Sequence, residues 1–240
     1  MKLKKPLKVE FIATSEKDLI RMNRPVPAIK SLPEWYSEQR SYTEGVKRIQ
    51  DHGVYNHTIK KCMPVFDVMS SGYIFQTICE LNVVKNNENT SWQWSMDGFT
   101  AIESHSKPQF DAMPIDKNLW NTQVAFKFIN PWIMRTPKGY STLFTMPFHH
   151  YDLPFYTLPA VVDTDKHPIA VNFPFLLKND FQGLISAGTP IIQAIPFKRD
   201  DWDSEFLYES PEKSAGEFGR GQQKFGNRYK TFWREIKTYT

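Results

Sequence analysis

The fold class is decided by residues 155–197, FYTLPAVVDTDKHPIAVNFPFLLKNDFQGLISAGTPIIQAIPF. This stretch holds three short apolar runs, within residues 156–165, 169–177 and 188–197. Each run is rich in β-branched or aromatic residues and is bounded by Pro, Gly, Asn or Asp, which favour turns. Short strands separated by regular turn signals are typical of antiparallel barrels and sandwiches. We therefore predict an all-β domain.

The same pattern extends towards the N-terminus from this stretch. Residues 122–139 and 140–148 contain further short apolar runs, and residues 92–98 resume a strand after a polar turn. Residues 62–85 mix apolar and β-branched residues and are predicted as strand, interrupted at Ser70-Ser71-Gly72. Residues 103–121 are polar and carry prolines without periodicity, which predicts a long surface loop.

The two ends of the chain differ from this centre. Residues 1–61 are predicted as an N-terminal extension with a first strand at 7–13, a proline-rich connector and two short helices, which begin within 15–22 and 32–40. The β domain is predicted over residues 62–200, with an insertion at about 85–120. Residues 201–240 are predicted to form an exposed C-terminal arm.

Composition excludes some functional classes. The net charge of +4 in 240 residues is mild, so nucleic acid is not an expected partner. No apolar run approaches the roughly 20 residues that cross a bilayer, and the basic N-terminus lacks the apolar stretch of a signal peptide. A cytosolic protein, or one released by cell lysis, is therefore expected. Cys62 and Cys79 lack metal-ligand spacing and are expected to be free thiols.

Three segments in the C-terminal half resemble motifs of the trimeric dUTPase superfamily. They are PAVVDTDKHPIAVNF (159–173), GLISAGTPIIQAIPF (183–197) and RGQQKFG (220–226), and they occur in the family's order. SSGYIF (70–75) and TPKGYSTLFTMPF (136–148) resemble two earlier motifs of the family. The resemblance implies a dUTPase-like β-clip and a homo-oligomer, with a trimer favoured. The whole chain is also similar to phage-encoded proteins of about this length, which implies the cytoplasm of an infected host cell, or the virion.

The resemblance also implies a site. Asp163 stands where the family's catalytic carboxylate activates water, and Asp165, Gln193, Arg220 and Phe225 stand at ligand-binding positions. In the family, Mg²⁺ bridges the triphosphate, so a metal is expected here only if the chain hydrolyses nucleotides. From its residue type alone, Asp163 suits either a catalytic base or the cap of a turn.

The sequence departs from the family pattern at the reacting centre. Lys166 replaces the tyrosine that stacks on the sugar, and Met146-Pro147 replaces the Arg-Ser pair. Ile74 replaces an aspartate, and Ala160 replaces a glycine. We therefore expect a non-catalytic structural, virion-associated or assembly module without a cofactor, with other virion proteins as possible partners. The alternatives are a nucleotide-binding sponge or regulator, and a divergent nucleotide pyrophosphatase that uses Asp163 and Mg²⁺.

Three other features leave alternatives open. Trp92 and Trp94 share one face of a strand, which favours a core stripe over a base-stacking platform or an oligomer contact. His149-His150 can chelate a metal together only in a turn, because neighbours on a strand point to opposite faces, and a hydrogen-bonded or exposed pair is the favoured interpretation. The basic, aromatic residues 228–240 are expected to dock on a neighbouring subunit.

Overall fold

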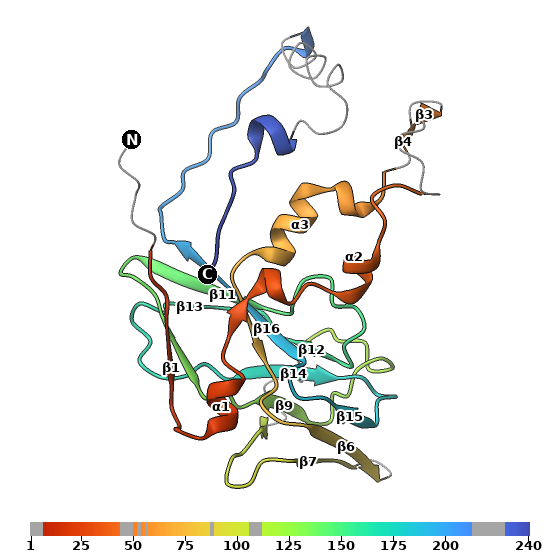
Figure 1. The fold of residues 1–240 in the computed structure, drawn as a ribbon, viewed down its shortest axis with the longest axis vertical. Coiled ribbons are helices and arrows are strands. Elements are labelled where there is room, and N and C mark those ends of the chain that lie inside the picture. Colours follow the sequence, from red (N-terminus) through yellow and green to blue (C-terminus); the bar gives the residue numbers. More distant parts are fainter. Residues whose placement is uncertain are drawn as a thin grey trace. The chain divides into compact units, whose positions relative to one another are not determined.

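The computed structural model describes residues 7–43, 50–51, 54–55, 57–86, 89–105, 112–212 and 229–240 (Figure 1). The chain divides into two compact units, which we describe separately. The first comprises residues 1–33, 69–199 and 239, and the second comprises residues 34–68, 200–238 and 240. Every strand pair in the described residues is antiparallel, so the prediction of an all-β chain with a few short helices is confirmed.

A five-stranded sheet contains most of the residues that the sequence singled out. Its strand order is β13 (Ala160–Val162), β11 (Tyr140–Thr145), β16 (Pro190–Lys198), β5 (Tyr73–Gln76) and β2 (Val26–Pro27). The register sets Thr142 of β11 between Val162 of β13 and Pro196 of β16. The long central strands β11 and β16 therefore bring the end of β13 and the end of β16 to the same part of the sheet.

Three smaller sheets complete the first unit. A four-stranded sheet has the order β12 (Phe155–Thr157), β14 (Phe173–Leu177), β9 (Ala125–Phe128), β8 (Ile102–His105). A three-stranded sheet has the order β15 (Gly183–Ile185), β6 (Leu81–Asn86), β7 (Asn89–Trp94). A two-stranded sheet pairs β1 (Glu10–Ala13) with β10 (Trp132–Arg135). The predicted strands of residues 122–197 are thus observed. The predicted loop of 103–121 is strand at its start, because β8 extends to His105.

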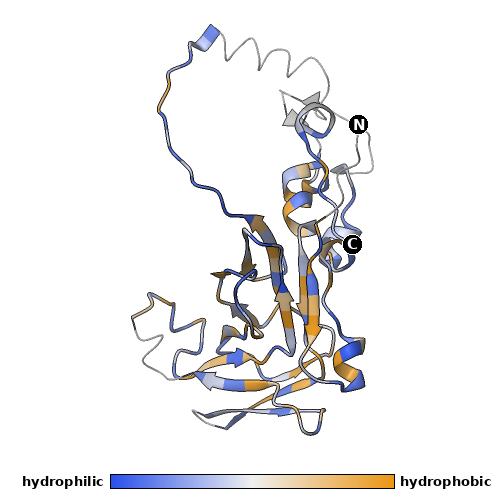
Figure 2. Cartoon of the chain, turned by 90° about the vertical axis from the view of Figure 1, so that its left-hand side faces the viewer, coloured by the Kyte–Doolittle hydropathy of each residue, from blue (hydrophilic) through white to orange (hydrophobic). Residues whose placement is uncertain are grey.

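Phenylalanine side chains form the core of the first unit. Phe175 is fully buried and stacks on Phe128 at a centroid distance of 4.0 Å, while Phe155 and Trp92 meet it edge to face. Trp92 and Trp94 both pack against this core. The core interpretation of the Trp92/Trp94 stripe is therefore confirmed. Figure 2 shows hydrophobic and hydrophilic residues following one another along the strands.

The prediction of strand was wrong for residues 63–70. They form helix α3 (Met63–Ser70), with Pro64 in its first turn, where proline is tolerated because the backbone N–H has no helical partner. Gly72 follows with φ of +74°, and a Cβ there would overlap the Ala194 carbonyl oxygen. Glycine thus allows the chain to leave α3 and enter β5 directly.

The two predicted N-terminal helices are observed as α1 (Asp18–Met22) and α2 (Glu34–Glu38), and the first strand as β1. The remaining elements are short. They are the 3₁₀ turns η1 (Ala28–Lys30) and η3 (Ile59–Lys61), the hairpin of β3 (Gln50–Asp51) with β4 (Val54–Tyr55), and the π-helical turn η5 (Tyr229–Trp233).

In the second unit, Arg234 is bound to Asp67 of α3. The Arg234 Nε and Nη2 donate to the carboxylate at 2.9 and 2.6 Å, and both side chains are largely buried. These hydrogen bonds and the positive charge of Arg234 hold the pKa of Asp67 below its usual value. Part of the C-terminal segment that was expected to dock on a neighbouring subunit is therefore bound within its own chain.

Both cysteines are free, as predicted, with Cys79 buried in the core. In the described residues, no helix combines the length and the apolar character that a membrane span needs.

Candidate functional site

Asp163 and Asp165, the two predicted site carboxylates, follow β13 and share one cation. Arg199, just after β16, donates to both oxygens of Asp165, at 2.8 Å from Nη1 and 2.5 Å from Nη2. The same Nη1 lies 3.3 Å from Oδ1 of Asp163. The Gly139 backbone N–H donates to Asp165 at 2.8 Å, and Ser141 donates to Asp163 at 2.6 Å. This group ties the β13 turn to β11 and β16.

The two carboxylates differ in environment. The Asp165 side chain is 3% exposed, whereas that of Asp163 is 51% exposed. The hydrogen bonds that Arg199 donates hold the pKa of Asp165 far below its usual range. The hydrogen bond from the Gly139 amide and the positive charge of Arg199 lower this pKa further. Asp165 therefore stays ionised at neutral pH and serves as the structural partner of Arg199.

Gln193, a predicted ligand-binding residue, is buried in the middle of β16. Its Nε2 donates to the Ser71 carbonyl at 2.6 Å, and its Oε1 accepts from the Phe148 amide at 3.1 Å. The side chain thus connects the turn after α3 with the turn after β11. Such buried amides are retained because they satisfy backbone groups that would otherwise lack hydrogen bonds.

The fold does not bring Gln193 to the predicted carboxylates. Gln193 pairs with Thr145 at one end of β11, whereas Asp163 contacts Ser141 at the other. Four residues of extended strand separate these positions by about 13 Å. The predictions for Arg220 and Phe225 lie outside the described residues.

A hollow that sequence reasoning missed lies beside the turn after β11. We call it the turn hollow; its volume is about 340 Å³. Aromatic and apolar side chains dominate its lining, and Lys178 is the one Lys or Arg among the described residues that line it. The lining residues used below are Trp120, Phe148, His149, Tyr151, Tyr156 and Lys178. The lining residues come from positions 120, 145–156 and 178, so no single local sequence motif predicts the hollow.

His149 and His150 lie in a turn, but they do not converge on one point. His149 has φ of +64°, which is uncommon for a residue with a side chain, and its Nδ1 lies 2.6 Å from the Tyr151 hydroxyl. His150 Nε2 donates to the Ser31 carbonyl at 3.1 Å, and burial lowers the pKa of this imidazole. No group of three or more His, Cys, Asp or Glu able to hold a metal occurs among the described residues.

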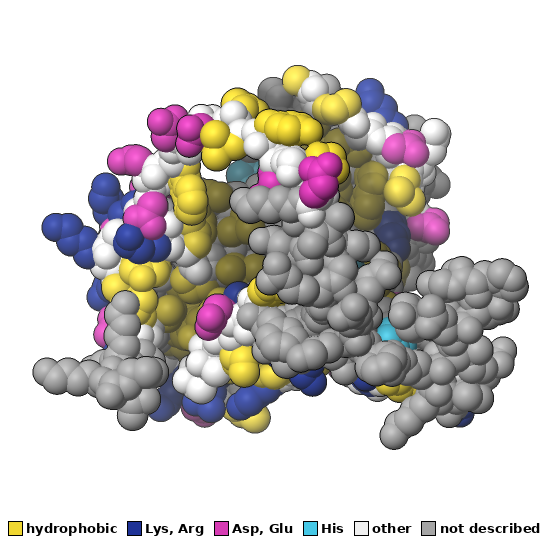
Figure 3. All heavy atoms as spheres, turned by 90° about the horizontal axis from the view of Figure 1, so that it is seen from above, with side chains coloured by type: hydrophobic (Ala, Val, Ile, Leu, Met, Phe, Trp, Pro, Cys, Tyr) yellow, Lys and Arg dark blue, Asp and Glu magenta, His cyan; other side chains and the backbone are white. Residues whose placement is uncertain are grey.

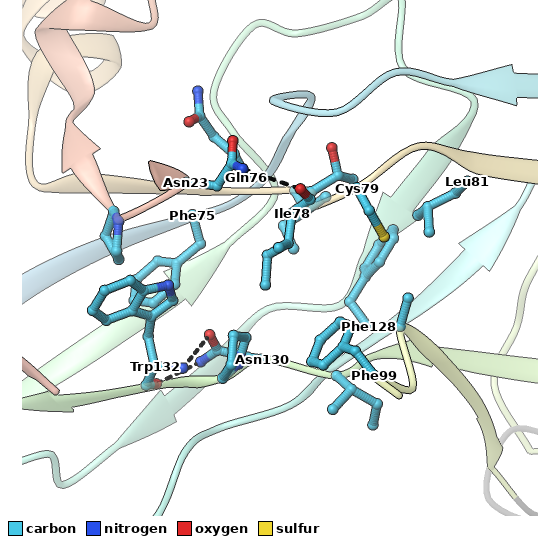
Figure 4. A pocket seen from close by; sticks show the side chains of 16 residues that line it. Asn23, Phe75, Gln76, Ile78, Cys79, Leu81, Phe99, Phe128, Asn130 and Trp132 are labelled. Carbon is cyan, nitrogen blue, oxygen red and sulfur yellow. Dashed lines mark hydrogen bonds between the residues drawn. The ribbon is translucent and has the colours of Figure 1, made fainter. Parts of the chain in front are cut away.

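A second cavity is lined by residues of β5, of β10 and of the loops next to them (Figure 4). Asn130 and Trp132 form one wall, and Phe75, Ile78 and Phe128 line the interior. Its volume of about 20 Å³ is room for roughly one water molecule. We therefore regard it as a gap in the core and not as a ligand site.

The chain matches no protein-family model, no curated protein and no solved structure.

Proposed function

We propose that this chain is a non-catalytic, dUTPase-like assembly module that associates with further copies of itself. The resemblance in its C-terminal motifs makes a trimer the expected assembly and a phage particle or an infected cell its expected setting. Two features of the structure support the proposal. One is that the predicted catalytic residue Asp163 and the predicted ligand-binding residues Asp165 and Gln193 are engaged in internal contacts, and the other is an exposed segment after β16.

Three of the predicted site residues, the catalytic candidate Asp163 and the ligand-binding candidates Asp165 and Gln193, form contacts that hold strands and turns together. Asp165 is ion-paired on both oxygens, and Asp163 accepts hydrogen bonds from Ser141 and Arg199 on one oxygen. Gln193 is buried and bridges two turns. A general base must be free to take a proton from a placed water, and phosphates need cations that are not already neutralised. This arrangement favours the structural alternative over the pyrophosphatase.

The single observation that carries the proposal is the exposure of residues 200–209, DDWDSEFLYE, which we call the acidic-aromatic segment. It is extended and forms no helix or strand (Figure 1). Its four large apolar side chains are 80–97% exposed: Trp202, Phe206, Leu207 and Tyr208. Five carboxylates lie between and beside them. Contiguous exposed apolar side chains of this size mark an interaction site, and aromatic residues dominate binding energy at interfaces.

On the face shown in Figure 3, the described Lys and Arg side chains alternate with Asp and Glu, and hydrophobic side chains lie between them. This mixture gives no large field of one sign that would favour nucleic acid. Protein–protein contact through the acidic-aromatic segment is the simpler proposal.

Sedimentation velocity over a range of concentrations tests the proposal. The wild-type chain is expected to sediment as a trimer, and Trp202→Ser with Phe206→Ser as a monomer. Ile169→Ser with Met22→Ser is the matched control, because these side chains are also exposed but lie elsewhere. A wild-type chain that remains monomeric at every concentration, or a control variant that dissociates equally, would contradict the proposal.

A further inference from the structure

The turn hollow has the lining of a site for an aromatic side chain. The rings of Trp120 and Tyr156 lie 6.1 Å apart, tilted by 53°, and Phe148 and Tyr151 also line the hollow. Tyr151 is 73% exposed and Tyr156 is 39% exposed, so the aromatic lining reaches the surface. The volume of about 340 Å³ lies near the lower end of the roughly 300–1,000 Å³ found for ligand sites. It suits one or two side chains and not a whole structural element.

The turn that lines the hollow is held in place by contacts behind it. The Phe148 amide donates to the buried Gln193, and His150 donates to the Ser31 carbonyl. His149 keeps its positive φ and lies within hydrogen-bond distance of Tyr151. Left-handed backbone at a residue with a side chain persists only where surrounding contacts determine it. The hollow is thus preformed, which lowers the entropic cost of binding.

The charge of the hollow complements the acidic-aromatic segment. Lys178 lines the hollow, and no Asp or Glu of the described residues lines it. No carboxylate among the described residues forms an ion pair with Lys178. In the segment, Trp202 stands directly between Asp201 and Asp203. An indole seated in the hollow would therefore bring a carboxylate beside the ammonium group of Lys178.

We propose that the turn hollow of one copy binds the acidic-aromatic segment of a second copy, with Trp202 as the anchor and Asp201 or Asp203 beside Lys178. The inference rests on the proposed self-association and specifies its contact. A segment that meets a different surface on the next copy forms a heterologous contact, which closes into a ring when the rotation permits. In a closed ring of three copies, every acidic-aromatic segment is bound in the turn hollow of the next copy.

Mixing two deficient variants tests this contact. Trp202→Ser keeps the hollow but lacks the anchor, whereas Lys178→Glu with Tyr156→Ala keeps the anchor but alters the hollow. Each variant alone is expected to be monomeric, because truncating an anchor residue at an interface raises the dissociation constant about tenfold or more. An equimolar mixture retains one productive segment–hollow pair and is expected to form a heterodimer that cannot close into a ring.

Charge reversal supplies the matched control. Lys178→Glu alone should weaken association, and adding Asp201→Lys with Asp203→Lys in the same chain should restore it. Thermal unfolding of each variant checks that the first unit remains folded. Restoration by the reversed pair would support the pairing of Lys178 with these carboxylates.

The possible failures are distinguishable. A monomeric wild type would overturn the proposed function itself. A wild type that associates, together with hollow variants that associate equally well, would overturn only the inference. Binding of a nucleoside triphosphate to Trp202→Ser that Lys178→Glu abolishes would also overturn it, because the hollow would then be a nucleotide site.

Discussion

Arg199 donates hydrogen bonds to both carboxylate oxygens of Asp165, from Nη1 at 2.8 Å and from Nη2 at 2.5 Å. Its Nη1 also donates to Asp163. The pair joins the residue after β16 to the turn after β13, across the intervening strand β11. A sequence motif that resembles a catalytic turn is therefore held by an internal cation. The same geometry makes the stability of the first unit depend on pH.

Arg199→Gln should lower the melting temperature of the first unit at pH 7, and the difference from wild type should diminish in acid. The folded-state pKa of Asp165 is depressed, so its stabilisation is present above the unfolded-state value of about 4. The contribution falls as pH drops from there towards the folded-state pKa. Thermal unfolding of both proteins between pH 7 and pH 3 measures this effect. An equal difference across that range would contradict the assignment, and Lys138→Gln is the control for removing a nearby positive charge.

Gln193→Met should destabilise the first unit by about 1–3 kcal/mol, because the Phe148 amide and the Ser71 carbonyl would each be left without this buried partner. Chemical denaturation of wild type and variant measures the change. Gln182→Met, at an exposed position, should leave stability nearly unchanged. If Gln193→Met left stability intact but abolished nucleotide binding, Gln193 would be a ligand-binding residue instead.

Gly72→Ala should be far more destabilising than Gly139→Ala, although both glycines have positive φ. A Cβ at Gly72 would overlap the Ala194 carbonyl, whereas a Cβ at Gly139 would meet nothing within 4 Å. Gly139→Ala therefore carries only the backbone strain, about 1 kcal/mol, and Gly72→Ala also forces β5 and β16 apart. Comparable melting temperatures for the two variants would show that the α3–β5 turn can adjust.

Nucleoside triphosphates with Mg²⁺ should yield no pyrophosphate with the purified chain. The reason is that Oδ1 of Asp163 already accepts hydrogen bonds from Ser141 and Arg199, and Gln193 lies about 13 Å away along the sheet. A coupled pyrophosphate assay with each deoxynucleotide measures turnover. Release of pyrophosphate that Asp163→Asn abolishes would establish the hydrolase alternative, and Asp180→Asn is the control for removing a carboxylate elsewhere.

Local sequence predicted the strands well where one face of each strand is buried. The apolar runs of residues 122–197 became β9 to β16 because each run carries its own strand propensity and its own turn residues. Residues 63–70 show the limit of this reasoning. Their apolar composition suits a strand or a helix equally, and Pro64 near the start with Gly72 just beyond the end favours the helix.

The sequence by itself determined the antiparallel β class, the strands within residues 122–197 and the exposed aromatic segment after β16, because these depend on the order of apolar, turn and charged residues. Only the tertiary structure decided the roles of the candidate site residues. Asp165 pairs with Arg199, 34 residues away, and Gln193 bonds to Ser71, 122 residues away. The turn hollow likewise assembles residues from three separate stretches. Strand pairing creates such contacts, and no local pattern encodes which distant partner a side chain will meet.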